Sequence, residues 1–158
     1  MRFRAPTLVS PSLALAGALL FAALTGQARA EETDPCFTAD GSIKVVLDAC
    51  AAYIASGSTD NERLITAHSV RAMGFSATGD LDAAVAELDA AVKIDPAKPN
   101  SYFMRAAAYE AKKDYDKAIA DLDEAVRLDA THGDYFLLRG IVYRDKGDFD
   151  QALIAFNE

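Results

Sequence analysis

A repeat of 34 residues organises the chain between residues 60 and 158. Three segments of seven residues align at this spacing, and they read GDLDAAV from Gly79, KDYDKAI from Lys113 and GDFDQAL from Gly147. The match extends upstream to one arginine in each copy, at Arg71, Arg105 and Arg139. Self-similarity at a fixed period of this length is typical of solenoids, in which each unit packs on its neighbours.

Each copy of the repeat predicts two amphipathic helices. In the second half of the middle copy, apolar residues recur at three- and four-residue spacing, at Tyr115, Ala118, Ile119, Leu122, Ala125 and Val126. This spacing places them on one helical face. Gly79 and Gly147 suit the ends of helices, and the aspartates that follow them suit the starts of the next helices. No segment alternates with period two for long enough to predict a strand.

Small and aromatic side chains also recur in the first half of each copy. A small residue stands at Ala72, Ala106 and Gly140, and an aromatic follows three residues later, at Phe75, Tyr109 and Tyr143. Together with the seven-residue motif and Asp95-Pro96, these features resemble the tetratricopeptide-repeat family. The form RGIVY at residues 139–143 resembles a variant common in exported bacterial members. The chain departs from the family where His68 replaces an aromatic, Ala130 replaces a proline, and the three arginines replace leucine.

This resemblance implies an all-α solenoid of antiparallel helix pairs. Units are expected near residues 65–98, 99–132 and 133–158, within a repeat region of residues 60–158. The third unit is incomplete, because by the period its second helix would run on past Glu158. We favour a fragment over a short final helix as the explanation. The open C-terminal face offers a route to self-association.

Residues 1–30 have the pattern of a secretory signal peptide. Arg2 and Arg4 precede an apolar run over residues 13–24, and Ala28 and Ala30 form a small-residue cleavage site. The run is too short to span the hydrocarbon core of a bilayer. We expect cleavage near Ala30 and a periplasmic or secreted mature chain that does not insert into the membrane. A buried helix or an uncleaved anchor is the alternative.

Residues 31–59 are expected to cap the N-terminal end of the solenoid. Their apolar residues lie at helical spacing, at Ile43, Val46, Leu47, Cys50 and Ile54. Cys36 and Cys50 are the only cysteines. In an oxidising compartment an even count predicts a disulfide, which would tie the leading stretch of chain to the capping helix. One buried and one free thiol is the alternative.

Composition narrows the range of functions. The formal net charge is −8, and the predicted signal segment carries three arginines and no acidic residue, so the mature chain is more acidic still. An acidic chain repels phosphate backbones, so no nucleic-acid partner is expected. His68 and His132 stand far apart, and neither neighbours a serine or cysteine at a motif spacing. We therefore predict no catalytic residue, no metal and no cofactor.

Two classes of function remain. The first is a protein–protein interaction scaffold that binds an unknown protein or peptide segment, and it is not an enzyme. The alternative is an exported enzyme or accessory subunit whose catalytic part lies beyond residue 158. The family resemblance favours the scaffold, although a fold does not define its partner.

The recurring arginines need carboxylate partners. Arg105 and Arg139 take positions where many members of the family bury leucine, and an unpaired buried guanidinium is too costly. Partners are expected on the second helix of the preceding unit: Glu87 or Asp89 for Arg105, and Asp121 or Asp123 for Arg139. Anion binding in the groove is the alternative role.

The resemblance also implies where a partner binds, since first helices line the concave face in this family. The groove candidates are Ser69, Met73, Asn100, Phe103, Met104, Ala107, Glu110, Leu137, Leu138, Ile141 and Arg144. The Lys and Asn clamp that some members use for a terminal carboxylate is missing. Phe103, Met104, Leu137 and Ile141 instead favour an apolar helix or extended segment, or the C-terminal helix of the chain itself that the period places after Glu158. Packing between units is the alternative role of these side chains.

Overall fold

The computed structural model describes residues 35–38 and 41–158, and this part of the chain is all-helical, without a strand. The helices are α2 (Pro35–Thr38), α3 (Ile43–Ala55), α4 (Asn61–Thr78), α5 (Leu81–Ile94), α6 (Pro99–Ala111), α7 (Tyr115–Leu128), α8 (Gly133–Lys146) and α9 (Phe149–Asn157). The predicted all-α fold is confirmed.

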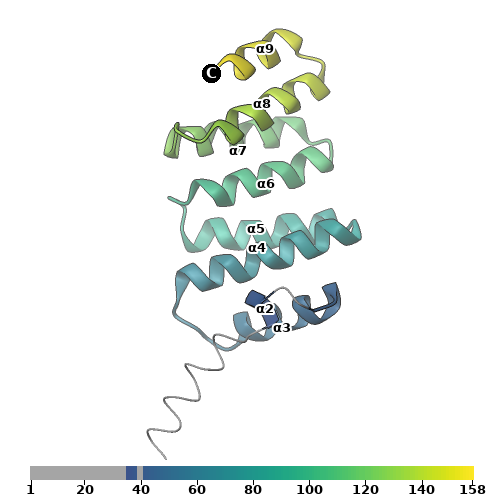
Figure 1. The fold of residues 1–158 in the computed structure, drawn as a ribbon, viewed down its shortest axis with the longest axis vertical. Helices are drawn as coiled ribbons and strands as arrows, with labels where there is room; N and C mark the ends of the chain where they lie inside the picture. Colours follow the sequence, from purple (N-terminus) through teal and green to yellow (C-terminus); the bar gives the residue numbers. More distant parts are fainter. Residues whose placement is uncertain (1–34, 39–40) are drawn as a thin grey trace, which may run out of the picture.

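The helices stack in chain order into an elongated solenoid. α4 packs with α5, α6 with α7 and α8 with α9, and neighbouring pairs meet through α5–α6 and α7–α8. Figure 1 shows this stack running from α2 and α3 at one end to α9 at the other. The first helices α4, α6 and α8 also contact one another in order, so they share one surface along the stack.

The turns inside the three pairs have the same backbone geometry. In each, an aspartate amide donates to an aromatic carbonyl at 2.9 Å: Asp80 to Phe75, Asp114 to Tyr109, and Asp148 to Tyr143. The residue before each aspartate has a positive φ, which is 83° at Gly79, 62° at Lys113 and 94° at Gly147. This left-handed conformation satisfies the last carbonyls of the preceding helix. The predicted helix ends and starts are therefore confirmed.

Small side chains set the spacing within each pair. Ala72 of α4 and Ala84 of α5 are fully buried in one core cluster with Leu88. The next pair repeats the arrangement, with Ala106, Ala118 and Leu122 all buried together. Because neither helix carries a large side chain at the crossing, the two backbones approach closely and the leucine fills the space beside them.

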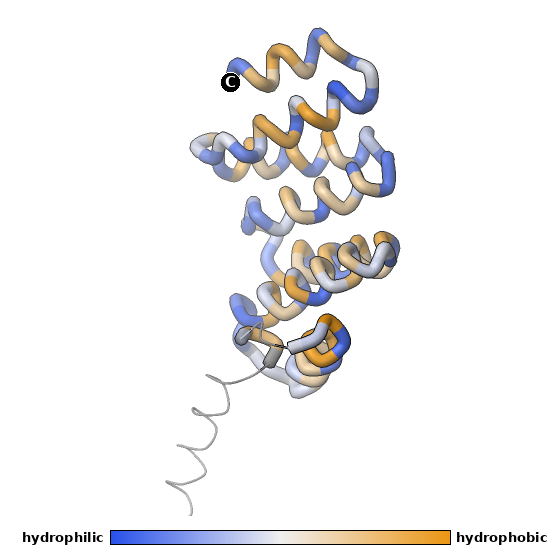
Figure 2. The backbone as a smooth tube through the Cα atoms, turned by 45° about the vertical axis from the view of Figure 1, so that its right-hand side comes forward, coloured by the Kyte–Doolittle hydropathy of each residue, from blue (hydrophilic) through white to orange (hydrophobic). Residues whose placement is uncertain are grey.

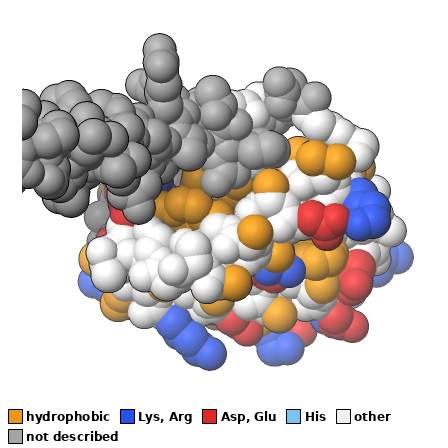
Figure 3. Space-filling view, turned by 90° about the horizontal axis from the view of Figure 1, so that it is seen from below, with side chains coloured by type: hydrophobic (Ala, Val, Ile, Leu, Met, Phe, Trp, Pro, Cys, Tyr) orange, Lys and Arg blue, Asp and Glu red, His pale blue; other side chains and the backbone are white. Residues whose placement is uncertain are grey.

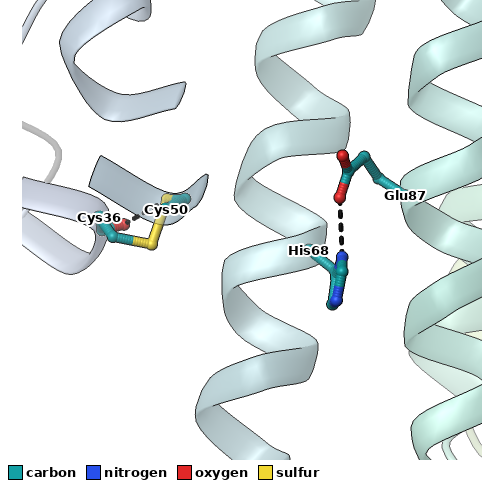
Figure 4. The surroundings of a disulfide bond; sticks show 4 residues. All are labelled: Cys36, Cys50, His68 and Glu87. Carbon is teal, nitrogen blue, oxygen red and sulfur yellow. Dashed lines mark hydrogen bonds and ion pairs between the residues drawn. A yellow bond between two sulfur atoms is a disulfide. The ribbon is translucent and has the colours of Figure 1, made fainter. Parts of the chain in front are cut away.

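The N-terminal cap packs against the first pair through a small core of its own. Cys36 and Cys50 are joined by a disulfide (Figure 4), and both are buried together with Ala67 of α4. The Phe37 and Tyr53 rings pack edge to face beside them, with centroids 5.0 Å apart. The predicted disulfide is confirmed. No helix was predicted ahead of the capping helix, but Cys36 lies in the short helix α2.

The expected signal peptide, residues 1–30, lies outside the described residues. Among the residues that the structure does describe, no helix combines the length and the apolar character needed to cross a bilayer.

Candidate partner-binding surface

Carboxylates hold the arginine of each first helix, and at Arg105 they do so from both sides. Arg105 of α6 donates to Asp121 of α7 through Nε at 2.8 Å and Nη2 at 2.7 Å, and to Asp89 of α5 through Nη1 at 2.7 Å. Its side chain is 17% exposed. The hydrogen bond with Asp121 is the main cause that raises the pKa of Arg105 above its ordinary value. Arg105 therefore ties two neighbouring helix pairs together.

The other two arginines vary this arrangement. Arg71 of α4 pairs with Glu87 of α5 at 3.0 Å, and His68 Nδ1 lies 2.7 Å from the second oxygen of the same carboxylate (Figure 4). Arg139 of α8 donates to Asp123 of α7 at 3.1 Å and also pairs with Glu158. All three guanidinium groups thus have structural partners.

The sequence predicted part of this network. The Arg105–Asp89 and Arg139–Asp123 pairs are confirmed, and both join an arginine to the preceding helix pair. The alternative partners, Glu87 for Arg105 and Asp121 for Arg139, were wrong, because Glu87 binds Arg71 and Asp121 binds Arg105. These two partners, which were not predicted, lie in the same helix pair as the arginine that they bind. A regular spacing of 16 residues from Arg71 to Glu87 and from Arg105 to Asp121 was the signal that could have found them.

An apolar hollow lies between α4 and α6, on the surface that the first helices share. This α4–α6 hollow has a volume of about 310 Å³. Its lining residues are Ala72, Met73, Ser76, Leu88, Phe103, Met104, Ala107, Ala108 and Ala111. Ser76 is the one lining residue whose side chain can donate a hydrogen bond, so the hollow suits an apolar side chain rather than a charged one.

A second hollow adjoins the first on the N-terminal side. This α3–α4 hollow has a volume of about 270 Å³ and is lined by Gly41, Ile43, Val46, Leu47, Val70, Met73, Gly74 and Ala77. Met73 borders both hollows and is 55% exposed. Its flexible thioether side chain stands between them, where it can adapt to different apolar ligands.

The structure brings together some of the predicted groove residues but not all of them. Met73, Phe103, Met104 and Ala107 line the α4–α6 hollow. The other candidates line neither hollow; they are Ser69, Asn100, Glu110, Leu137, Leu138, Ile141 and Arg144.

Several candidates also contribute to packing. Met104 packs on the core cluster of the first pair, while Phe103 and Leu138 pack on that of the second. Phe103 also contacts the Tyr135 ring of α8, with centroids 5.3 Å apart. Leu137, by contrast, is largely exposed. Side chains such as Phe103 therefore belong both to the core and to the hollow, which the sequence had offered as alternatives.

The contribution of the capping helix to this surface was not predicted. Ile43, Val46 and Leu47 of α3 line the α3–α4 hollow, although their sequence pattern predicted only a capping role. Their helical spacing was visible, but spacing alone does not tell which apolar residues meet a neighbouring helix and which border an opening.

Charged side chains of both signs are present at the end of the stack that carries α2 and α3. Figure 3 views this end, and the visible part shows hydrophobic side chains among acidic and basic ones. In the described part of the chain, no group of three or more His, Cys, Asp or Glu residues is placed to hold a metal ion. His132 stands apart from His68 and packs edge to face on Tyr135.

Solved structures with the same fold include several repeat proteins. A structure of MamA matches with a TM-score of 0.69 and 17% identity, over 80% of this chain and 71% of its own. A structure of YrrB, described as a TPR protein with an unusual peptide-binding site, matches with a TM-score of 0.63 and 16% identity, over 73% of this chain and 57% of its own. At these identities the similarity establishes the fold alone.

A third structure is the second TPR of Spaghetti (RPAP3) bound to the HSP90 peptide SRMEEVD. It matches with a TM-score of 0.56 and 25% identity, over 59% of this chain and 86% of its own. Among curated protein sequences, none matches this chain significantly.

The sequence itself matches a family model described as "Tetratricopeptide repeat". The matched regions are residues 70–133 and 114–158, which overlap and together span more than half of the chain. The three shared turns and the small residues at the crossings of the first two pairs are all found in the matched region. The chain therefore belongs to the tetratricopeptide-repeat family.

Proposed function

We propose that this protein is a periplasmic or secreted interaction scaffold that binds an apolar peptide or protein segment in the groove along its first helices. The α4–α6 hollow is the observation that carries this proposal. It opens between two helices of the repeat array, and its lining is apolar apart from Ser76. A rigid array with an apolar opening suits the binding of a partner's side chains.

Two related structures support a peptide as the ligand. The RPAP3 domain was solved with a bound HSP90 peptide, and YrrB is described as having a peptide-binding site. The ligand of the present chain differs in character from an acidic peptide such as SRMEEVD, because the α4–α6 hollow presents no basic side chain. We infer that the ligand inserts one or more apolar side chains on either side of Met73.

The disulfide supports an oxidising location. The Cys36–Cys50 bond accounts for both cysteines of the chain, and such bonds persist in the periplasm or outside the cell. This agrees with the signal-peptide pattern of residues 1–30. A non-catalytic role is part of the proposal, and it rests on the family and on the structural function found for all three repeat arginines.

Affinity capture with one groove variant tests the proposal. Ala107 is exposed and lines the α4–α6 hollow, so Ala107→Arg would fill the hollow without removing a core side chain. The matched control is Ala120→Arg, at an exposed alanine of α7 that lines neither hollow. Arginine suits a helix well in both places.

The capture would use the purified protein and a periplasmic extract of the organism that produces it. We expect the unmodified protein and the Ala120→Arg variant to retain the same partner and the Ala107→Arg variant to lose it. Equal capture by both variants would show that the partner binds elsewhere.

A further inference from the structure

Two methionines border the α4–α6 hollow, Met73 of α4 and Met104 of α6. The sequence has three methionines, and the third is Met1, in the predicted signal segment. Both cysteines of the chain are joined in the Cys36–Cys50 disulfide, so neither offers a thiol. Once the signal segment is removed, the sulfur atoms that can still take up oxygen as thioethers are therefore gathered at one opening.

The two thioethers differ in their access to solvent. Met73 is 55% exposed, whereas Met104 is half-buried and packs on the core cluster of the first helix pair. The Met104 sulfur also accepts a hydrogen bond from the side-chain amide of Asn100, 3.7 Å away. A dissolved oxidant must reach the sulfur atom, so susceptibility follows exposure. Exposure therefore favours reaction at Met73.

The position of Met73 gives its oxidation a consequence. Its side chain borders both the α4–α6 hollow and the α3–α4 hollow. Hydrophobic residues recur among hydrophilic ones along the helices of the stack (Figure 2), and the lining of the two hollows is drawn mainly from them. Oxidation turns an apolar thioether into a polar sulfoxide. At position 73 it would place a polar oxygen at the mouth of both hollows.

We propose that Met73 is an oxidation site, and that its sulfoxide lowers the affinity of the groove for apolar ligands. The oxidant is hydrogen peroxide. The thioether sulfur attacks one peroxide oxygen, the O–O bond breaks, and the products are methionine sulfoxide and water. The sulfur loses two electrons, which the peroxide takes up. A methionine sulfoxide reductase restores the thioether by oxidising two thiols to a disulfide, with release of water.

The loss of affinity follows from the scarcity of hydrogen-bond donors around Met73. Ser76 lies three residues further along α4, on the same helical face, and its hydroxyl is the one side-chain donor in the lining of the two hollows. An apolar ligand that enters the hollow displaces water from the sulfoxide oxygen. A single hydroxyl offsets only part of that cost. This effect on ligands rests on the proposed function, whereas the oxidation of Met73 does not.

Peptide mapping by mass spectrometry tests the site of modification. The purified protein is treated with hydrogen peroxide for increasing times, and the gain of one oxygen atom is followed at each methionine. We expect Met73 to react at least about threefold faster than Met104. In urea-unfolded protein the two rates should be equal, because exposure no longer distinguishes them. Equal rates in the folded protein, or a faster rate at Met104, would overturn the assignment.

A dye titration tests the effect on the groove. Nile red, an uncharged apolar dye, is the probe, and the part of its binding that Ala107→Arg removes belongs to the α4–α6 hollow. We expect peroxide to weaken this binding about tenfold. Met73→Gln, which carries a polar group of similar size, should bind as weakly as the oxidised protein without any peroxide.

Each oxidation-resistant variant is compared with itself before and after peroxide. Met73→Leu, a substitution of similar volume, should show no fall in affinity, while Met104→Leu, the matched control, should show the full fall. An equal fall in Met73→Leu, or no fall in the unmodified protein once Met73 is oxidised, would overturn the inference. If Ala107→Arg removes no dye binding at all, the proposed function and the effect on ligands both fail, and the oxidation rates alone decide the modification site.

Discussion

Gly140 of α8 shows how one missing methyl group changes the packing of a helix pair. A Cβ atom built at this position would lie 2.3 Å from the ring of Phe156. The other two pairs carry an alanine at the position of Gly140 and a leucine at the position of Phe156, as in Ala106 and Leu122. In the last pair, the methyl group that is missing at Gly140 of α8 makes room for a larger side chain, Phe156 of α9.

The exchange predicts a compensating pair of substitutions. Gly140→Ala alone should lower the free energy of unfolding by about 1 kcal/mol, because displacement of the Phe156 ring outweighs the gain in helix propensity. Adding Phe156→Leu should restore stability to that of the unmodified protein or above. Urea unfolding of the two variants and of Phe156→Leu alone measures this coupling. Simple additivity of the two changes would contradict the packing argument.

Lys113 carries backbone strain that glycine relieves in the other two turns. Its φ of 62° lies in the left-handed region, where Gly79 and Gly147 stand in the equivalent turns. Lys113→Gly should raise the free energy of unfolding by about 0.5–1 kcal/mol. The control is Ala111→Gly, in the last turn of α6, which should lower it. If both substitutions destabilise equally, the left-handed strain at Lys113 is negligible.

At the scale of elements, the repeat made the helices and turns predictable. Each turn depends on a short local motif, and its geometry needs no information from distant parts of the chain. The arginine pairs were only half predictable, because whether Arg105 reaches Asp89, Asp121 or both depends on how two helix pairs stack. The α3–α4 hollow was missed for the same reason.

The N-terminal cap depends on the disulfide for its shortest element. α2 has four residues, too few to be stable as an isolated helix. It is held through Cys36, which is bonded to Cys50 and buried against Ala67. Loss of this bond should release α2 from α3 while α4 to α9 remain packed.

Reduction therefore has a local and measurable effect. The loop that the bond closes would contribute about 3 kcal/mol in the chain-entropy account. We expect a reducing agent to lower the unfolding midpoint and to speed amide exchange in α2 and α3 before the other helices. The double variant Cys36→Ala/Cys50→Ala is the control, since reductant should then have no effect. Unchanged exchange in α2 after reduction would contradict this role of the bond.

For the whole molecule, exposed ion pairs act both between helix pairs, as Lys112 with Asp82 does, and within one helix, as Arg127 with Glu124 does in α7. The hydrogen bond from Lys112 lowers the pKa of Asp82 below its ordinary value of 3.8, and the bond from Arg127 lowers that of Glu124 below 4.5. A carboxyl group whose pKa is lower in the folded state stabilises the fold above its unfolded pKa. It loses that contribution as the pH falls through its folded pKa.

The protein should consequently lose stability in acid. We expect the thermal unfolding midpoint to decrease as the pH falls below 4.5, the ordinary pKa of Glu124, and the decrease to be smaller for Asp82→Asn. Because these pairs are exposed, added salt should reduce the pH dependence. A midpoint that stays constant or rises down to about pH 3 would contradict the sign of these pKa shifts.

The central claim is that a partner binds along the first helices beside Met73. Site-specific photo-crosslinking in the native host tests it directly, with a benzophenone amino acid at position 73 in one strain and at position 120 in another. Met73 borders both hollows, whereas Ala120 is exposed on α7 and borders neither. We predict a covalent adduct with a partner from position 73 and none from position 120. An adduct from position 120 alone would contradict the claim.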